Sequence, residues 1–310
     1  MTDREVNLVK LHDPLFEEHF IELYVYQLQN LHPTVNGNKW FKLKYNLEEA
    51  KRLKHTTIVT FGGAWSNHIY ATAASCKELG YKSIGVIRGE RPGQLNSCLQ
   101  FAESCGMHLH FIDRENYRKK ESVDFQENLR KQFGEFYLIP EGGANALGVK
   151  GCREIMDKVG TFDYVCCACG TGATIAGLTL SLTEKQQAIG FSALKGGGFL
   201  VEEIEKFRGL YLQHVGTTSP LPSLTEKEKN RKEVEIIVDY HFGGYAKVNS
   251  LLTDFVKAFE KQHHIALDYV YTAKMMFGLY DLIRKNHFKP GSKIIALHTG
   301  GMQGNKGFEN

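Results

Sequence analysis

The chain has 310 residues, of which 42% are hydrophobic and 24% charged, so it is a globular protein long enough for about two domains. Its net charge of +3 is too small to indicate nucleic acid or an acidic membrane surface as a partner. The charged N-terminal stretch predicts no signal peptide, and no apolar run reaches the roughly 18 residues of a membrane helix. The seven scattered cysteines predict no disulfide framework, which favours a reducing cytoplasm.

Short apolar runs alternate with amphipathic stretches of helical length. The pattern predicts strands at 56–63, 82–89, 109–113, 136–143, 162–172, 187–198, 234–239 and 293–301. It predicts helices at 66–80, 93–106, 114–133, 145–160, 173–183, 247–263 and 272–286. Such alternation predicts an α/β fold with a parallel sheet covered by helices on both faces. The polar stretch 218–233 interrupts the pattern and predicts an exposed excursion.

Several predicted strands end in glycine turns. These turns are Gly62-Gly63, Gly142-Gly143, Gly170-Thr171-Gly172, Gly196-Gly197-Gly198 and Gly300-Gly301. Glycine allows the backbone to approach a ligand closely and to adopt positive φ. Because ligands bind at the carboxyl edge of open parallel sheets, we expect the functional site where these turns gather.

The stretch CGTGATIAGL (169–178) is the best candidate for binding a phosphate. A strand leads into Gly170, Thr171, Gly172, Ala173 and Thr174, and a helix follows. Free N–H groups and the helix dipole favour an anion at such a helix start, and the two threonines add hydroxyl donors. A tight turn that binds nothing is the alternative. The glycines only loosely match G-x-G-x-x-G and no suitably spaced acidic residue follows, so a NAD(P)-dependent oxidoreductase is a weak third hypothesis.

Two other motifs have both a structural and a functional interpretation. Ser66, Asn67 and His68 open a predicted helix, where they can bind a substrate carboxylate or where Ser66 can simply cap the helix. The run CCAC (166–169) lies in a predicted strand, where buried thiols act as small hydrophobic groups. Because no second Cys/His cluster accompanies the run, we predict no metal site.

The stretch PTVNGNKWFK (33–42) places Lys39 and Lys42 beside Trp40 and Phe41. Most lysines are solvated, but desolvation beside apolar groups lowers the pKa of an amine and makes it suitable for imine chemistry. The residues themselves do not decide between the two lysines.

The motifs NGNKWFKLKYNLEEAK, GGAWSNHIYATAA, EGGANALGVKG, CGTGATIAGL, DYVYTAKMMFGL and LHTGG follow one another along the chain. Together they resemble the pyridoxal-phosphate enzymes of the tryptophan-synthase β-type fold, and more narrowly the 1-aminocyclopropane-1-carboxylate deaminase / D-cysteine desulfhydrase family. The resemblance implies two domains, each an open, mostly parallel sheet with helices on both faces. The larger would comprise 1–44 and 151–310 and the smaller 45–150, with the site in the cleft between them. It also implies pyridoxal 5'-phosphate as cofactor and a homodimer.

The resemblance also implies roles for individual residues. Lys39, rather than Lys42, would form the Schiff base with the cofactor and remove the α-proton of the substrate. Ser66 and His68 would face the substrate carboxylate, and Asn67, in the same motif, would bond the cofactor's 3-hydroxyl group. The loop of Gly170, Thr171, Gly172, Ala173 and Thr174 would hold the cofactor phosphate.

Two tyrosines and two threonines complete the set that the resemblance implies. Tyr271 and Tyr245 match active-site tyrosines, although Tyr245 can equally be a core aromatic residue. Family members that open the cyclopropane ring have a Glu and a Leu where this chain has Thr272 and Thr299. Hydroxyl partners would leave the pyridine nitrogen neutral, which favours the desulfhydrase branch.

The resemblance therefore predicts a lyase that converts a small amino acid by β-elimination, with D-cysteine giving pyruvate, sulfide and ammonia as the best choice. The alternatives are a 1-aminocyclopropane-1-carboxylate deaminase and a non-catalytic small-molecule binder of the same fold. Relatives usually have a charged K-R-D-D-L cluster before the lysine, where this chain has Gln27, Gln29 and Asn30. That departure leaves the substrate open.

Overall fold

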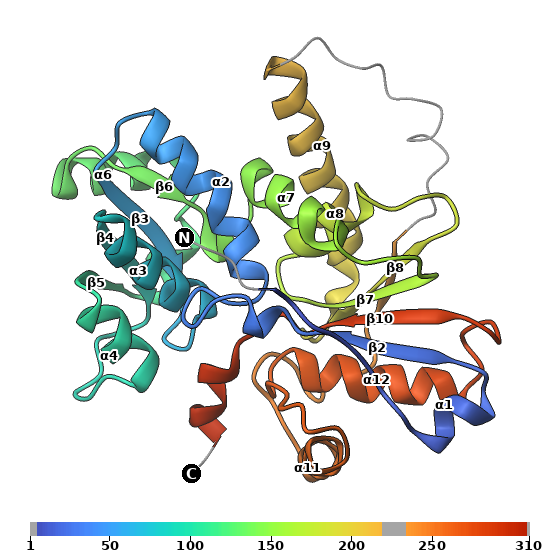
Figure 1. Cartoon of the computed structure of the whole chain (residues 1–310). Helices are drawn as coiled ribbons and strands as arrows, with labels where there is room; N and C mark the ends of the chain where they lie inside the picture. Colours follow the sequence, from blue (N-terminus) through green and yellow to red (C-terminus); the bar gives the residue numbers. More distant parts are fainter. Residues whose placement is uncertain (1–4, 219–233, 309–310) are drawn as a thin grey trace.

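The computed structural model describes residues 5–218 and 234–308 and contains two open sheets (Figure 1). The smaller sheet has the strand order β5 (Met107–Ile112), β4 (Lys82–Arg88), β3 (Thr57–Gly62), β6 (Tyr137–Ile139). All its neighbouring strands are parallel. Their carboxyl ends therefore share one edge of the sheet.

The larger sheet is mostly parallel as well. Its order is β1 (Leu8–Lys10), β2 (Glu22–Tyr26), β10 (Lys293–Leu297), β7 (Tyr164–Cys169), β8 (Gln187–Ser192), β9 (Glu235–Ile237). Only the edge pair β1–β2 is antiparallel among these strands. As predicted, β7 is a buried strand, and it places the thiols of Cys166, Cys167 and Cys169 in the core.

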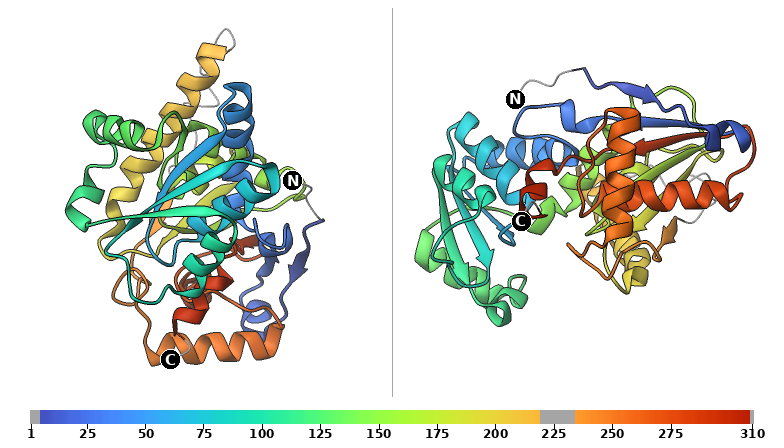
Figure 2. Two further views of the ribbon diagram at one scale, coloured as in Figure 1. Left: turned by 90° about the vertical axis from the view of Figure 1, so that its left-hand side faces the viewer. Right: turned by 90° about the horizontal axis from the view of Figure 1, so that it is seen from below.

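Helices cover both faces of each sheet, as the α/β prediction requires (Figure 2). The smaller sheet packs against α2 (Asn38–Arg52), α3 (Asn67–Leu79) and α4 (Ser97–Ser104) on one face and α5 (Arg114–Arg118) and α6 (Val123–Phe133) on the other. The larger packs against α1 (Pro14–Glu18), α11 (Ser250–His263) and α12 (Thr272–Arg284), and against α7 (Ala146–Arg153), α8 (Ala173–Thr179) and α9 (Leu200–Thr218).

Some predicted elements differ from the structure. The helix predicted at 114–133 is two helices, because Ser122 interrupts it and its Oγ caps α6 by accepting from the N–H of Phe125. The helix predicted at 145–160 ends at Arg153, and a 3-10 turn follows it. The elements β1, α1, β2, α2 and α9 were not predicted.

Three further predictions concern the excursion at 218–233, the domain boundaries and the absence of membrane helices. Residues 219–233 of the predicted excursion lie outside the described residues. The domain boundaries stay a prediction, although all strands of the smaller sheet fall between residues 57 and 139. Within the described ranges, no helix is both long and apolar enough to cross a membrane.

Candidate active site

Glycine contacts bring several turns of the two sheets together. Gly37 has φ +65°, and a Cβ there would lie 1.9 Å from the carbonyl oxygen of Thr299, so the start of α2 packs tightly against the end of β10. A Cβ on Gly142 would lie 3.2 Å from Cγ2 of Thr171, which joins the turn after β6 to the turn after β7. These turns thus gather at one place, as predicted. The turn at Gly197 instead packs against its own neighbours, Ser192 and Leu200.

Lys39 and Lys42 occupy the first turns of α2. Lys42 is only 2% exposed, whereas Lys39 is half-buried. In the part of the chain that the structure describes, neither amine has a hydrogen-bond or ion-pair partner. Burial, and then the charge of Lys42, lower the pKa of Lys39 to about 7. Burial also lowers the pKa of Lys42. The amine of Lys39 is therefore partly deprotonated near neutral pH, as a nucleophile or base requires.

The helix that carries these lysines is tied to the glycine–threonine loop. Asn38 Nδ2 donates to Thr174 Oγ1 over 2.9 Å. Gly172 has φ +84°, and the N–H of Ala176 donates to its carbonyl oxygen in the first turn of α8. The N–H groups ahead of Ala176 have no partner within the helix. The lysines therefore lie beside a helix start that offers donors to an anion.

Ser66 and Asn67 lie at the start of α3. The Oγ of Ser66 accepts from the N–H of Ile69, so the predicted cap is present, and its hydroxyl proton remains available to a substrate carboxylate. Asn67 Oδ1 accepts from Gln303 Nε2 over 2.9 Å. The Nδ2 of Asn67 lies beside Gly301, since a Cβ on that glycine would come within 2.5 Å of it.

His68 faces the protein interior. Its Nε2 lies 2.8 Å from Thr60 Oγ1, and that hydroxyl donates to the carbonyl oxygen of Ile139. The hydroxyl proton is therefore used, so Nε2 must be the donor and Nδ1 is left as an acceptor, which is buried without a partner among the described residues. Burial, with the charges of Lys39 and Lys42, holds the pKa of His68 well below its ordinary value. The ring is neutral, which makes it a weak partner for a carboxylate.

Both predicted tyrosines lie at this place. A Cβ on Gly170 would lie 3.2 Å from the hydroxyl oxygen of Tyr271, so the phenol packs directly against the glycine–threonine loop. The rings of Tyr245 and Tyr271 meet edge to face, with 6.0 Å between centroids. Burial and the neighbouring Tyr245 raise the pKa of Tyr271 well above its ordinary value. Tyr271 is therefore protonated at neutral pH and can serve as a proton donor.

The two predicted threonines differ in their hydrogen bonding. Thr272 Oγ1 donates to Asp268 Oδ2 and accepts from the N–H of Asp268 over 2.9 Å. The Asp268 carboxylate also accepts the N–H groups of Tyr271 and Thr272, where α12 begins. The hydroxyl of Thr299 has no hydrogen bond within the described ranges. Of the two, Thr299 is the one whose hydroxyl is free to bind a ligand.

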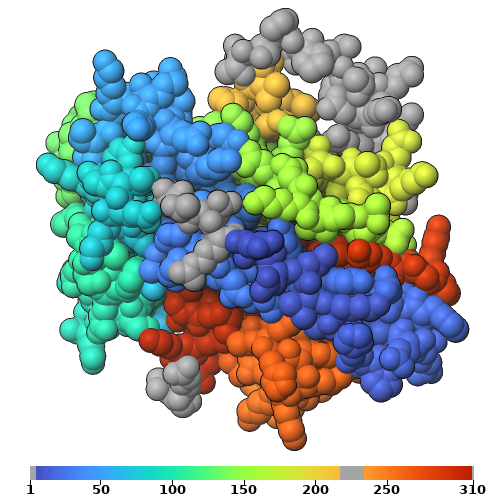
Figure 3. Space-filling view, in the orientation of Figure 1, coloured from blue at the N-terminus to red at the C-terminus, as the bar shows by residue number. Residues whose placement is uncertain are grey.

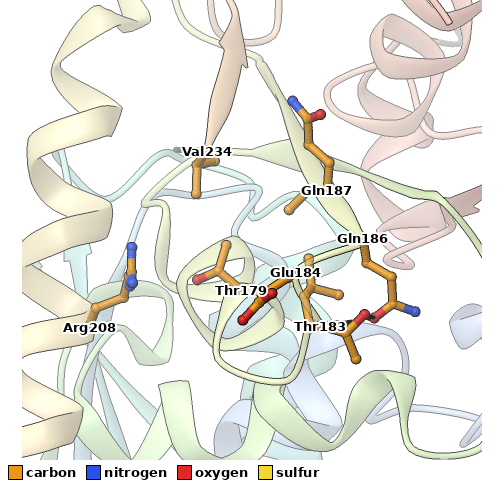
Figure 4. Close-up of a pocket in the computed structure, with 9 residues that line it drawn as sticks. Thr179, Thr183, Glu184, Gln186, Gln187, Arg208 and Val234 are labelled. Atoms are coloured by element: carbon orange, nitrogen blue, oxygen red, sulfur yellow. Dashed lines mark hydrogen bonds between the residues drawn. The ribbon is translucent and has the colours of Figure 1, made fainter. Parts of the chain in front are cut away.

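A small pocket elsewhere in the structure does not coincide with these residues. It has a volume of about 20 Å³ and lies between the end of α8, the start of β8 and α9 (Figure 4). Thr179, Gln187 and Arg208 are among the residues that line it. This is the amino edge of the larger sheet, opposite the glycine turns, and its volume is suited to a single water rather than a cofactor.

Comparisons with known proteins identify the family. Residues 8–300 match the family model described as pyridoxal-phosphate dependent enzyme. The chain belongs to the pyridoxal-phosphate dependent enzyme family. A Pyrococcus furiosus protein provisionally named 1-aminocyclopropane-1-carboxylate deaminase is 31% identical over 87% of this chain and 82% of its own length.

Two further relatives place the chain near one branch of this family. The Arabidopsis thaliana protein named bifunctional D-cysteine desulfhydrase/1-aminocyclopropane-1-carboxylate deaminase, mitochondrial, is 30% identical over 87% of this chain and 70% of its own length. The crystal structure of an ACC deaminase homologue superposes with a TM-score of 0.81 at 26% identity, over 97% of this chain and 91% of that one. These matches confirm the predicted fold class, in which both sheets lie within one pyridoxal-phosphate enzyme.

The residues on this site fit the family's cofactor. Lys39 provides an unpartnered amine with a pKa of about 7 for the aldehyde carbon. The helix start after Gly172 provides donors for a phosphate, and Lys42 provides a buried amine, without a partner in the described part of the chain, that an anion would hold in its charged form. A buried ammonium without a partner is costly, and an anionic group removes that cost.

Sequence reasoning missed several residues that build this site. Asn38 stands inside a quoted motif, but its bond to Thr174 spans 136 positions and has no local signal. Asp268 had no such signal either, because it lies four residues before α12 begins and Tyr271 occupies the N-cap position. Gln303 had none, since it follows the last motif and reaches Asn67 from 236 positions away.

Proposed function

We propose that this protein is a lyase that removes the β-substituent of a small amino acid, with D-cysteine as the substrate. D-Cysteine and water would give pyruvate, hydrogen sulfide and ammonia. The observation that carries the proposal is the amine of Lys39, whose pKa of about 7 makes it a base at neutral pH beside an anion-binding helix start. Its position on α2 and the family membership both support Lys39 as the residue that bonds the cofactor.

The cofactor, once bound through Lys39, supplies an electron sink that stabilises negative charge on the substrate's α-carbon. Lys42 and the loop from Gly170 to Thr174 would hold its phosphate, because they supply a buried positive charge and free N–H donors. The hydroxyl of Thr299 would meet the ring nitrogen. Asn67 would donate from Nδ2 to the ring oxygen.

The chain's own residues would then perform the proton transfers. Ser66 and the free N–H groups at the start of α3 would bind the substrate carboxylate. The amine of Lys39 would take the proton from the α-carbon, and the phenol of Tyr271, which is protonated at neutral pH, would donate a hydrogen bond to the departing thiolate. Tyr245, which packs on Tyr271, would hold that phenol in place.

The choice of D-cysteine rests on the two threonines. A carboxylate in contact with the ring nitrogen favours its protonated form, which opening a cyclopropane ring requires, and position 272 has no carboxylate. A weaker electron sink, such as a ring with a neutral nitrogen, is sufficient for the departure of a thiolate.

A second substrate, 1-aminocyclopropane-1-carboxylate, is supported by one observation. The buried Asp268 lies directly behind Thr272, and the hydroxyl of Thr272 donates to it. A hydroxyl whose proton is used in this way can only accept from a ring nitrogen, which would favour the protonated ring. Ring-opening activity would therefore be expected if Thr272, rather than Thr299, is the partner.

The deciding experiment is a visible absorption spectrum of the purified protein beside a Lys39→Ala variant. We expect a yellow band that borohydride removes and that the variant lacks. Pyruvate formation is then measured with D-cysteine, L-cysteine, D-serine and 1-aminocyclopropane-1-carboxylate, and D-cysteine should have the highest kcat/KM. A protein that stays colourless with added pyridoxal phosphate would overturn the proposal. A yellow protein that turns over none of the four would indicate the non-catalytic binder.

We also propose a homodimer located in the cytoplasm. The family resemblance supports the dimer, and the free cysteines, which are mostly buried, fit a reducing compartment. Light scattering on the eluted protein tests the assembly, and a monomer would contradict it.

A further inference from the structure

The last described segment of the chain forms a bridge between the two halves of the molecule. This segment, η5 (Met302–Phe308), lies between the smaller sheet's helices and α11 in Figures 1 and 2, and Figure 3 shows its red atoms between the teal and orange surfaces. Asn305 binds the larger half, since its Nδ2 donates to the carbonyl oxygen of Leu267 and its Oδ1 accepts the N–H of Tyr269. On the other side, a Cβ on Gly307 would touch the indole of Trp65 at 3.2 Å.

One side chain of this bridge reaches a residue of the proposed site. Gln303 Nε2 donates to Asn67 Oδ1 over 2.9 Å. In this arrangement the oxygen of the Asn67 amide is occupied and Nδ2 is left as a donor. Nδ2 makes no hydrogen bond within the described ranges and lies beside Gly301, at the end of the turn that follows β10.

We propose that Gln303 is a positioning residue that orients the Asn67 amide so that Nδ2, not Oδ1, faces the cofactor. The proposal rests on the proposed function, in which Asn67 donates to the ring oxygen of pyridoxal phosphate. An amide can turn end for end at little cost, since its two ends are nearly the same size. Gln303 is also an amide, so the bond couples the orientations of the two side chains, and the observed arrangement leaves Nδ2 of Asn67 as the free donor. The C-terminal bridge thereby holds in place a group in the smaller sheet's half.

The test uses two substitutions that differ in hydrogen bonding but little in size. In Gln303→Glu the new carboxylate only accepts, so it attracts Nδ2 of Asn67 and turns Oδ1 toward the cofactor. In Gln303→Met the side chain neither donates nor accepts, so the Asn67 amide loses its preference for one orientation. Lys306→Gln is the matched control, because it lies on the same exposed segment and changes the net charge by the same amount as Gln303→Glu.

The readout is the affinity of the cofactor-depleted full chain for pyridoxal phosphate, together with the position of the visible band after reloading. We expect Gln303→Glu to weaken binding about tenfold and to shift the band, Gln303→Met to weaken it about threefold, and the control to match the wild type. In an Asn67→Ala background, Gln303→Glu should have almost no further effect, because its action passes through Asn67.

Three outcomes would overturn the inference. Wild-type affinity and spectrum in Gln303→Glu would show that the bond does not orient Asn67. An equal loss in the Asn67→Ala background would show that Gln303 acts by another route. A loss that follows only thermal stability, with Gln303→Met worse than Gln303→Glu, would show a packing role. If wild-type protein binds no pyridoxal phosphate, both the proposed function and this inference fail. If wild-type protein turns over substrate normally and Gln303→Glu behaves like it, only this inference fails.

Discussion

Two helices of this protein bury lysines near their first turns, but the surroundings of the amines differ. On α12, Lys274 is 1% exposed and its Nζ donates to the carbonyl oxygens of His241 over 2.9 Å and Gly244 over 2.7 Å. On α2, the equally buried Lys42 and the neighbouring Lys39 have no such acceptors in the described part of the chain. Burial lowers the pKa in both places, to about 8 for Lys274 and about 7 for Lys39.

The difference between these lysines lies in their hydrogen-bond partners rather than in burial, because within the described residues only the amine of Lys274 is bonded to acceptors. Lys274 holds a loop with unusual backbone geometry, in which Phe242 and Ala246 both have φ +53°. That loop presents Tyr245 to the site, so Lys274 serves the site through the backbone. The amine of Lys39 is not engaged and remains free to react.

The largest expected effect comes from replacing Lys39 with arginine, and the same change at Lys274 is the comparison. Lys39→Arg should lower kcat for D-cysteine by at least about 10³-fold, because a guanidinium neither bonds the cofactor aldehyde nor accepts a proton near pH 7. Lys274→Arg keeps a donor for both carbonyls and should stay within about tenfold of the wild type. Pyruvate release at saturating substrate measures both. More than a tenth of wild-type activity in Lys39→Arg would mean that another group removes the proton.

The next effect concerns stability. Lys274→Met should lower the free energy of unfolding by ~2–4 kcal/mol, because the carbonyls of His241 and Gly244 lose their buried donor. Lys42→Met, in cofactor-free protein, should leave that free energy unchanged or raise it, because it removes a buried charge without a partner. Urea denaturation of both variants makes the comparison. If Lys42→Met lowered the free energy of unfolding as much as Lys274→Met, Lys42 would also have a stabilising partner.

The pH dependence of stability sharpens the comparison further. The pKa of Lys39 is about 7 in the folded protein against an ordinary 10.5, so between these values the unfolded chain binds more protons. The unfolding free energy of cofactor-free protein should therefore rise with pH, by at most ~3 kcal/mol from pH 7 to pH 9. Lys39→Met should reduce the rise and leave the contributions of Lys42 and Lys274, whose pKa values burial also lowers. An identical slope in the variant would show that Lys39 keeps its ordinary pKa.

The smallest expected effect tests the bond that joins α2 to the glycine–threonine loop. Asn38→Ala and Thr174→Val should each cost ~1 kcal/mol of unfolding free energy, and the double variant should cost less than their sum. Cofactor affinity should fall in parallel, because the bond sets the distance between the lysines and the loop. Strict additivity would mean that the 2.9 Å contact contributes nothing.

The sequence by itself determined the alternation of strands and helices and the turns at which they meet. Those features depend on local periodicity and on glycine, so β3, β4, β7 and β10 were placed close to their observed positions. It also contained a signal that was not used for α9, where Leu200, Ile204, Phe207 and Tyr211 recur at helical spacing and are all buried. The motif order also predicts Lys39 as the reactive lysine, and that assignment stays a prediction.

Only the tertiary structure decided how the amines, amides and hydroxyls of the site are partnered. Lys42 and Lys274 are alike in sequence terms, yet only Lys274 meets two carbonyl oxygens, from a loop about 30 positions away. The oxygen of the Asn67 amide accepts from Gln303, 236 positions away, and the hydroxyl of Thr272 donates to Asp268. Burial and hydrogen-bond partners come from segments that meet only on folding, so no local pattern in the chain contains them.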